Sequence, residues 1–212
     1  ISGLATAGID VTDPFELLLS IRRIGSRRLE EMWGPGERQE GALRDRKPIV
    51  RATTVAALEA QGDGVLAAID PKVAKAIREA GFTACVTSTD VHEYGKILVE
   101  TVLERLGVIV VDAGVSADPD AVAERAEAEG ADFVAISTYC GVALDYLRKL
   151  RREMAARGLR IPIFIGGKLN QVPDDGSSSI PVDVTEQLEA LDAFACSDVE
   201  EMLGELAGIA RD

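Results

Sequence analysis

From Phe82 onward, short apolar segments rich in β-branched residues alternate with amphipathic segments of helical periodicity. This alternation is typical of a parallel sheet covered by helices on both faces. The predicted strands are Thr83 to Ser88, Val108 to Asp112, Phe133 to Ser137, Ile161 to Ile165 and Ala193 to Cys196. The predicted helices are Gly95 to Leu106, Asp118 to Glu129, Ala143 to Arg157, Val184 to Leu191 and Asp198 to Ala210. We therefore predict an α/β fold with a five-stranded parallel sheet of order 2-1-3-4-5, as in flavodoxin-like (Rossmann-like) proteins.

The N-terminal part of the chain does not show this alternation, so we divide the chain into a helical segment, residues 1–80, and a main domain, residues 81–212. Helices are predicted for Asp13 to Met32, Thr54 to Ile69 and Pro71 to Ala80, and a charged, loosely ordered stretch for Glu37 to Lys47. Gly62 and Gly64 weaken the second of these helices. The segment could cap the sheet, contact a partner or belong to a neighbouring domain. In the main domain, the polar stretch from Asp174 to Ser179 is predicted to be a flexible loop.

Charge and cysteine content limit the class of protein. The formal net charge of −13 argues against a nucleic-acid partner, because phosphate binding needs clustered Lys and Arg. No apolar stretch reaches the roughly 20 residues that a membrane helix requires, so no membrane association is expected. Cys85, Cys140 and Cys196 show no paired spacing, which favours a reducing, cytoplasmic location. We expect all three cysteines to be buried, although Cys140 has the alternative of lining a pocket.

The first predicted strand ends in a polar loop, Ser88 to Gly95, that contains the only histidine of the chain, His92. The carboxyl end of the first strand is where an open α/β sheet binds its ligands. A neutral imidazole binds a metal through one nitrogen while a carboxylate holds its other N–H, and Asp90 is placed to be that carboxylate. Gly95 is expected to let the backbone turn sharply into the next helix. One histidine and one carboxylate are too few for a protein-only zinc site, but they suffice where a macrocycle supplies the remaining ligands.

Asp90, His92 and Gly95 match the D-x-H-x-x-G motif, and this segment resembles cobalamin (vitamin B12)-binding domains in position as well as in residues. The resemblance implies that the dimethylbenzimidazole base of the cofactor leaves cobalt and that His92 replaces it as the lower axial ligand. It also implies that Asp90 orients His92 and that the displaced nucleotide tail enters a channel in the sheet. Dinucleotide and nucleoside triphosphate sites are not indicated, because the sequence has no G-x-G-x-x-G after a strand and no Walker lysine loop.

Two elements further along the chain extend the resemblance. Ser137 matches the serine of the family's S-x-L segment, whereas Tyr139 departs from its leucine, and Gly166 and Gly167 match the G-G pair along which the tail lies. We expect Gly167→Val to obstruct the tail while leaving the fold largely intact. The implied cofactor-binding residues are Ser88, Thr89, Asp90, Val91, His92, Glu93, Tyr94, Gly95, Ser137, Thr138, Tyr139, Gly166 and Gly167, with His92 as the cobalt ligand.

The sequence contains no convincing acid/base or nucleophile set, so no catalytic residue is predicted. The resemblance implies a component that is inactive alone and presents cobalamin to a separate catalytic barrel, in a hetero-oligomer. Ser137 to Gly141 and the insertion after Gly167 are similar to the small subunit of glutamate mutase, which favours an adenosylcobalamin-dependent mutase (isomerase). The alternative is a corrinoid protein that carries a methyl group, as methylcobalamin, in a methyltransferase system. Gly95-Lys96 and Val111 to Val115 are similar to such carriers.

Overall fold

The computed structural model describes residues 52–173 and 180–210, which lie in one compact unit, Val50–Asp212. Three sequence-based predictions lie outside the described residues. They are the helix from Asp13 to Met32, the charged stretch from Glu37 to Lys47 and the loop from Asp174 to Ser179. The division of the chain at residue 81 stays a prediction.

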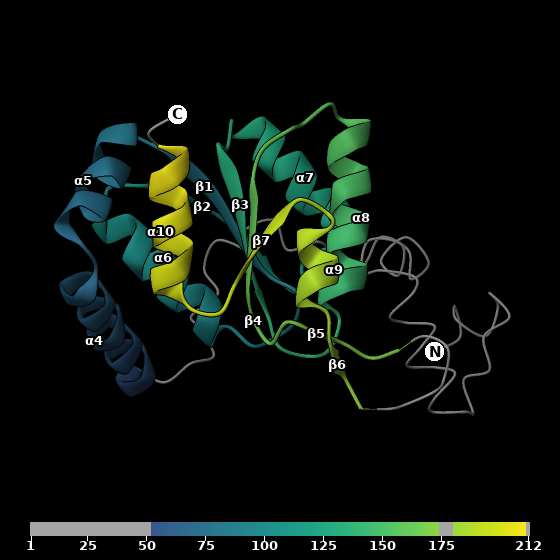
Figure 1. Ribbon diagram of the computed structural model, residues 1–212, viewed down its shortest axis with the longest axis horizontal. Coiled ribbons are helices and arrows are strands. Elements are labelled where there is room, and N and C mark those ends of the chain that lie inside the picture. Colours follow the sequence, from purple (N-terminus) through teal and green to yellow (C-terminus); the bar gives the residue numbers. More distant parts are fainter. Residues whose placement is uncertain (1–51, 174–179, 211–212) are drawn as a thin grey trace, which may run out of the picture. The chain divides into compact units, whose positions relative to one another are not determined.

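A five-stranded parallel sheet forms the centre of the described unit (Figure 1). Its strands are β1 (Thr83–Ser88), β2 (Ile109–Val115), β3 (Phe133–Thr138), β4 (Ile163–Gly167) and β7 (Ala193–Cys196). They follow the order β2-β1-β3-β4-β7, which confirms the predicted fold class and strand order. Two short antiparallel strands, β5 (Asn170–Gln171) and β6 (Val182–Asp183), were not predicted, because a two-residue strand leaves no periodicity in the sequence.

Helices cover both faces of the sheet, as Figure 1 shows. One face carries α6 (Tyr94–Arg105), α10 (Val199–Ile209) and α5 (Pro71–Ala80), and the other carries α7 (Pro119–Ala128), α8 (Ala143–Ala156) and α9 (Thr185–Glu189). Alternate residues of each strand face opposite helical layers, so that Ala84 and Val86 join one core and Cys85 joins the other. This arrangement confirms that both sheet faces are buried.

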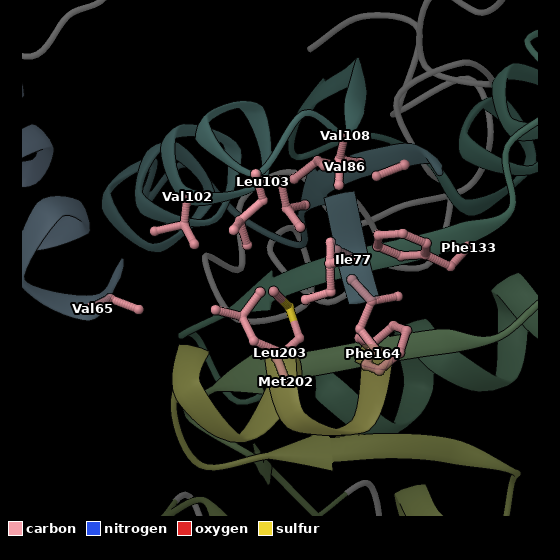
Figure 2. Packing of buried hydrophobic residues seen from close by; sticks show 14 of the residues in the cluster. Val65, Ile77, Val86, Val102, Leu103, Val108, Phe133, Phe164, Met202 and Leu203 are labelled. Atoms are coloured by element: carbon pink, nitrogen blue, oxygen red, sulfur yellow. The ribbon is translucent and has the colours of Figure 1, made fainter. Parts of the chain in front are cut away.

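Aromatic and aliphatic side chains fill the core on the face covered by α5, α6 and α10. The rings of Phe133 and Phe164 meet edge to face with their centroids 5.4 Å apart, and both side chains are fully buried. Figure 2 shows Ile77 from α5, Leu203 from α10 and Phe164 from β4 in this cluster. The core thus ties the helices to the central strands and fixes the carboxyl edge of the sheet.

The helix α4 (Ala52–Ala68) precedes α5 and belongs to the same core through Leu58 and Val65. It packs against α6, while α5 packs against α10. Asp70 caps α5 by accepting a hydrogen bond from the backbone N–H of Lys72, at 2.8 Å. Both helices match the sequence prediction within two residues. Among the described helices, none is both long enough and apolar enough to cross a membrane.

Candidate functional site

The loop between β1 and α6 is fixed against the end of β3 by hydrogen bonds. The backbone N–H of Thr89 donates to the carbonyl oxygen of Ser137 at 2.9 Å, and the hydroxyls of Thr89 and Thr138 lie 3.1 Å apart. The hydroxyl of Ser88 lies 3.3 Å from the carbonyl oxygen of His92 and spans the base of the loop. The loop is therefore held at the point where strand order reverses, which is the ligand-binding edge of this type of sheet.

Asp90 and His92 form the pair that the sequence predicted. Nδ1 of His92 lies 2.6 Å from Oδ1 of Asp90, and the same oxygen accepts a hydrogen bond from the backbone N–H of His92 at 2.9 Å. When Nδ1 donates to this carboxylate, the lone pair of Nε2 is free for a metal. The His92 side chain is 42% exposed, whereas that of Asp90 is 11% exposed, so the imidazole reaches the surface from a buried support.

Asp90 is held as a carboxylate by several donors. Its Oδ2 accepts the backbone N–H groups of Tyr139 and Cys140, at 2.9 and 3.1 Å, and the hydroxyl of Thr89 at 3.2 Å. Burial raises the pKa of Asp90, but the hydrogen bonds from His92, Tyr139 and Cys140 outweigh burial and hold the pKa below its usual value. The carboxylate thus fixes the orientation of the imidazole and joins the ends of β1 and β3.

Three exposed hydrophobic side chains lie close to His92, two of them beside it in the sequence and one against its ring. Val91, Tyr94 and Tyr139 are 72%, 51% and 54% exposed, and the Tyr139 ring lies against the imidazole with centroids 4.5 Å apart. Exposed apolar groups close to a predicted metal ligand are typical of a surface that a ligand covers. Tyr139, the residue that departs from the family pattern, is thus in direct contact with the predicted ligand.

The expectation that Cys140 is buried is wrong. Cys140 is exposed, and its Sγ lies 3.5 Å from Nδ1 of His92, because the residue follows the end of β3 and not the strand interior. Asp90, His92 and Cys140 bring three potential metal ligands within 4.8 Å of one another. However, both oxygens of Asp90 already accept hydrogen bonds, and partial burial with the charge of Asp90 raises the pKa of the Cys140 thiol. Of these three side chains, His92 is therefore the one that can offer a free lone pair to a metal, through Nε2.

Gly95 has a different role from the one predicted. It lies in the first turn of α6 and its φ is not positive, so the sharp turn that we expected there is absent. Instead, a Cβ atom at Gly95 would lie 2.4 Å from Oγ of Ser137 on β3. A glycine is favoured here because α6 and β3 approach each other closely. The contact brings together Gly95 and Ser137, two residues of the family pattern that are distant in sequence.

Gly166 and Gly167 end β4 in different environments. A Cβ atom at Gly166 would lie 3.3 Å from the carbonyl oxygen of Cys196, which is a tight contact. Gly167 has a φ of 103°, and its Cβ would lie 2.3 Å from the carbonyl oxygen of Thr138. The expectation that Gly167→Val leaves the fold intact is therefore wrong, because the valine would displace the end of β3 or β4.

A cavity of about 560 Å³ opens at this edge of the sheet. It is lined by the ends of β1, β3 and β4, by α6, by the start of α10 and by α4. Among the predicted residues, Gly95, Ser137, Gly166 and Gly167 line it, whereas His92 and its neighbours in the loop do not. The predicted site thus has two parts, an exposed imidazole with an apolar surround and an adjacent cavity.

Lys96 is a residue of this edge that the sequence prediction missed. It is 5% exposed, lines the cavity, and its Nζ lies 2.5 Å from Glu100 and 2.7 Å from Asp112. Burial lowers the pKa of Lys96, but the two carboxylates outweigh burial and raise it above 10.5. Burial raises the pKa of Glu100. The i, i+4 spacing of Lys96 and Glu100 was a signal for their pairing, but Asp112 lies on another element.

One protein family matches most of the described chain. Residues 72–195, more than half of the 212-residue chain, match the family described as B12 binding domain. The methionine synthase of Mycobacterium tuberculosis is 24% identical over 159 residues, which are 73% of this chain and 12% of that protein. The methionine synthase of Mycobacterium leprae is 26% identical over 145 residues, 68% of this chain and 12% of that protein. The chain therefore spans about an eighth of the length of these relatives.

Among solved structures, the methanol:cobalamin methyltransferase complex MtaBC from Methanosarcina barkeri has a TM-score of 0.50 with this chain and 18% sequence identity. The match covers 62% of this chain and 47% of that one. At this level of identity the likeness shows that the two chains share a fold.

Proposed function

Because this chain belongs to the family of B12 binding domains, we propose that it carries a cobalamin with the benzimidazole off cobalt and His92 as the lower axial ligand. The observation that supports this proposal most is the 2.6 Å contact between Nδ1 of His92 and Oδ1 of Asp90. It leaves Nε2 free at the exposed end of the ring and makes the imidazole a more basic ligand.

The surroundings of His92 fit a large flat macrocycle. Val91 and Tyr94, near His92 in the sequence, and Tyr139, against its ring, present exposed apolar surface, which suits the lower face of a corrin. The adjacent cavity of about 560 Å³ has the size of a small-molecule site, and Gly166 and Gly167 are among the residues that line it. We assign this cavity to the displaced nucleotide tail.

The bound cobalamin would supply the difficult chemistry, through its cobalt–carbon bond, and the protein would supply binding and orientation. The described residues hold His92 in place and line the adjacent cavity, so they would bind and orient the cofactor at the carboxyl edge of the sheet. We therefore propose that the chain works with a catalytic barrel, in the same polypeptide or in a hetero-oligomer. The cytoplasmic location inferred from the cysteines stays a prediction.

The curated relatives support methyl transfer as the reaction class, because both are methionine synthases. The mutase favoured by the sequence remains the second candidate, since it rests on the segment from Ser137 to Gly141 and the insertion after Gly167. Methyl transfer and the mutase reaction can be distinguished by what each cofactor form does when substrate is added. Substrate-dependent methyl transfer from methylcobalamin indicates the carrier, whereas substrate-dependent Co(II) from adenosylcobalamin indicates the mutase.

The axial assignment is tested with His92→Ala and His92→Gln. Electron paramagnetic resonance of the Co(II) form should show a protein nitrogen on cobalt in the wild-type chain and none in either variant. Gln keeps a donor near Asp90, so it serves as a control for collapse of the loop. A wild-type spectrum without a protein nitrogen, or a nitrogen signal that survives in both variants, contradicts the assignment of His92.

A further inference from the structure

One wall of the cavity comes from the helix that precedes the residues matching the family. Gln61, Gly64 and Val65 of α4 line it, whereas the match begins at residue 72. The start of α10 also lies outside the match, which ends at residue 195, and the linings from α6, β1, β3 and β4 lie within it. The cavity is thus completed by two helices that flank the matched region.

Close packing holds α4 in place against α6. A Cβ atom at Gly62 would lie 3.3 Å from Cγ2 of Thr101 and 3.4 Å from Cγ2 of Val102, so the two helices approach as closely as the glycine permits. Asp63 forms an ion pair with Arg105 of α6. Val65, labelled in Figure 2, is buried in the core on the same side. The wall therefore has a defined position and is not a loosely attached segment.

Gly64 differs from Gly62 in its surroundings. No atom lies within 4 Å of a Cβ built at Gly64, and the residue faces the cavity. Gly64 therefore leaves space that any larger residue would fill. Gln61, one helical turn earlier and on the same side of α4, adds to the cavity lining an amide that can donate and accept hydrogen bonds.

We infer that α4 closes the cavity around the lower base of the corrinoid and selects that base by size, with Gly64 providing the space and Gln61 a polar contact. This inference rests on the proposed function, because it takes the nucleotide tail as the occupant of the cavity. The two glycines that weaken α4 as an isolated helix thus have separate roles. Gly62 brings the wall close to α6, and Gly64 keeps it open toward the ligand.

The test compares cobalamin with cobinamide, which lacks the base, by spectrophotometric titration of the full chain. Gly64→Leu should weaken cobalamin binding about tenfold or more and cobinamide binding less than about twofold, because only the base reaches α4. Leucine favours a helix more than glycine does, so α4 is retained. Gly204→Leu is the matched control, since Gly204 is a helical glycine with equally open surroundings and does not line the cavity. It should change neither affinity.

A second variant, Gln61→Leu, removes the amide at nearly constant volume and should also weaken cobalamin more than cobinamide. Equal changes for the two corrinoids, or no change in either variant, would overturn the inference about α4. Failure of the proposed function gives a different result. In that case the wild-type chain binds cobalamin no better than cobinamide, or binds it with no protein nitrogen on cobalt.

Discussion

Replacing Gly167 by alanine should destabilise the protein strongly, although the change adds a single methyl group. The φ of 103° costs an alanine about 1–3 kcal/mol. Its Cβ would also lie 2.3 Å from the carbonyl oxygen of Thr138, which itself accepts the backbone N–H of Lys168 at 2.8 Å. Relieving such an overlap costs about 1–3 kcal/mol more. Reduced flexibility of the unfolded chain offsets about 0.4–1 kcal/mol, so we expect a net loss of about 3 kcal/mol.

Urea denaturation followed by circular dichroism measures this loss, and thermal unfolding should show a decrease in Tm of about 6–12 °C. Gly166→Ala is the matched control, because a Cβ there meets the oxygen of Cys196 at 3.3 Å and its φ is not positive. We expect that variant to remain within about 1 kcal/mol of the wild type. If the two alanine variants have equal stability, the reasoning from backbone conformation and close approach is refuted.

Two further predictions concern the same edge of the sheet. Gly95→Ala should destabilise the protein by about 1–2 kcal/mol when Ser137 is present, but not in a Ser137→Ala background, where the oxygen 2.4 Å from the new Cβ is absent. Additive effects in this double-mutant cycle, measured by urea denaturation, would contradict the contact. Because the pKa of Lys96 is raised in the folded state, its contribution to stability is complete below pH 10.5 and is lost as pH rises through the folded pKa. The difference in unfolding free energy between the wild type and Lys96→Met should therefore be constant well below pH 10.5 and shrink as pH rises above it, and a difference that stays constant there would argue against the buried ion pairs.

The fold could be predicted because its signals are local in sequence. The strands Thr83–Ser88 and Ala193–Cys196 have the bounds that the apolar segments predicted, and the crossover pattern implied their order in the sheet. The short strands Asn170–Gln171 and Val182–Asp183 were missed because they depend on contacts between chain segments and not on their own composition.

The pairing of Asp90 with His92 was also predictable, since two residues separated by one position on a tight loop need no distant partner to meet. The exposure of Cys140 could not be predicted, because it depends on where β3 ends relative to the loop after β1. The alternative that Cys140 lines a pocket was the available signal, since its neighbour Tyr139 contacts His92.

The sequence by itself determined the type of sheet, the edge where the predicted site lies and the pairing of the histidine with its carboxylate, because periodicity and short-range spacing carry that information. Only the tertiary structure decided why particular glycines are needed. Gly95 lies against Ser137, Gly167 against Thr138 and Gly62 against Thr101, and each contact joins residues far apart in the chain. It likewise decided that α4 forms a wall of the cavity. Such close approaches are set by how helices and strands pack on one another, and a residue's immediate neighbours in sequence do not determine that packing.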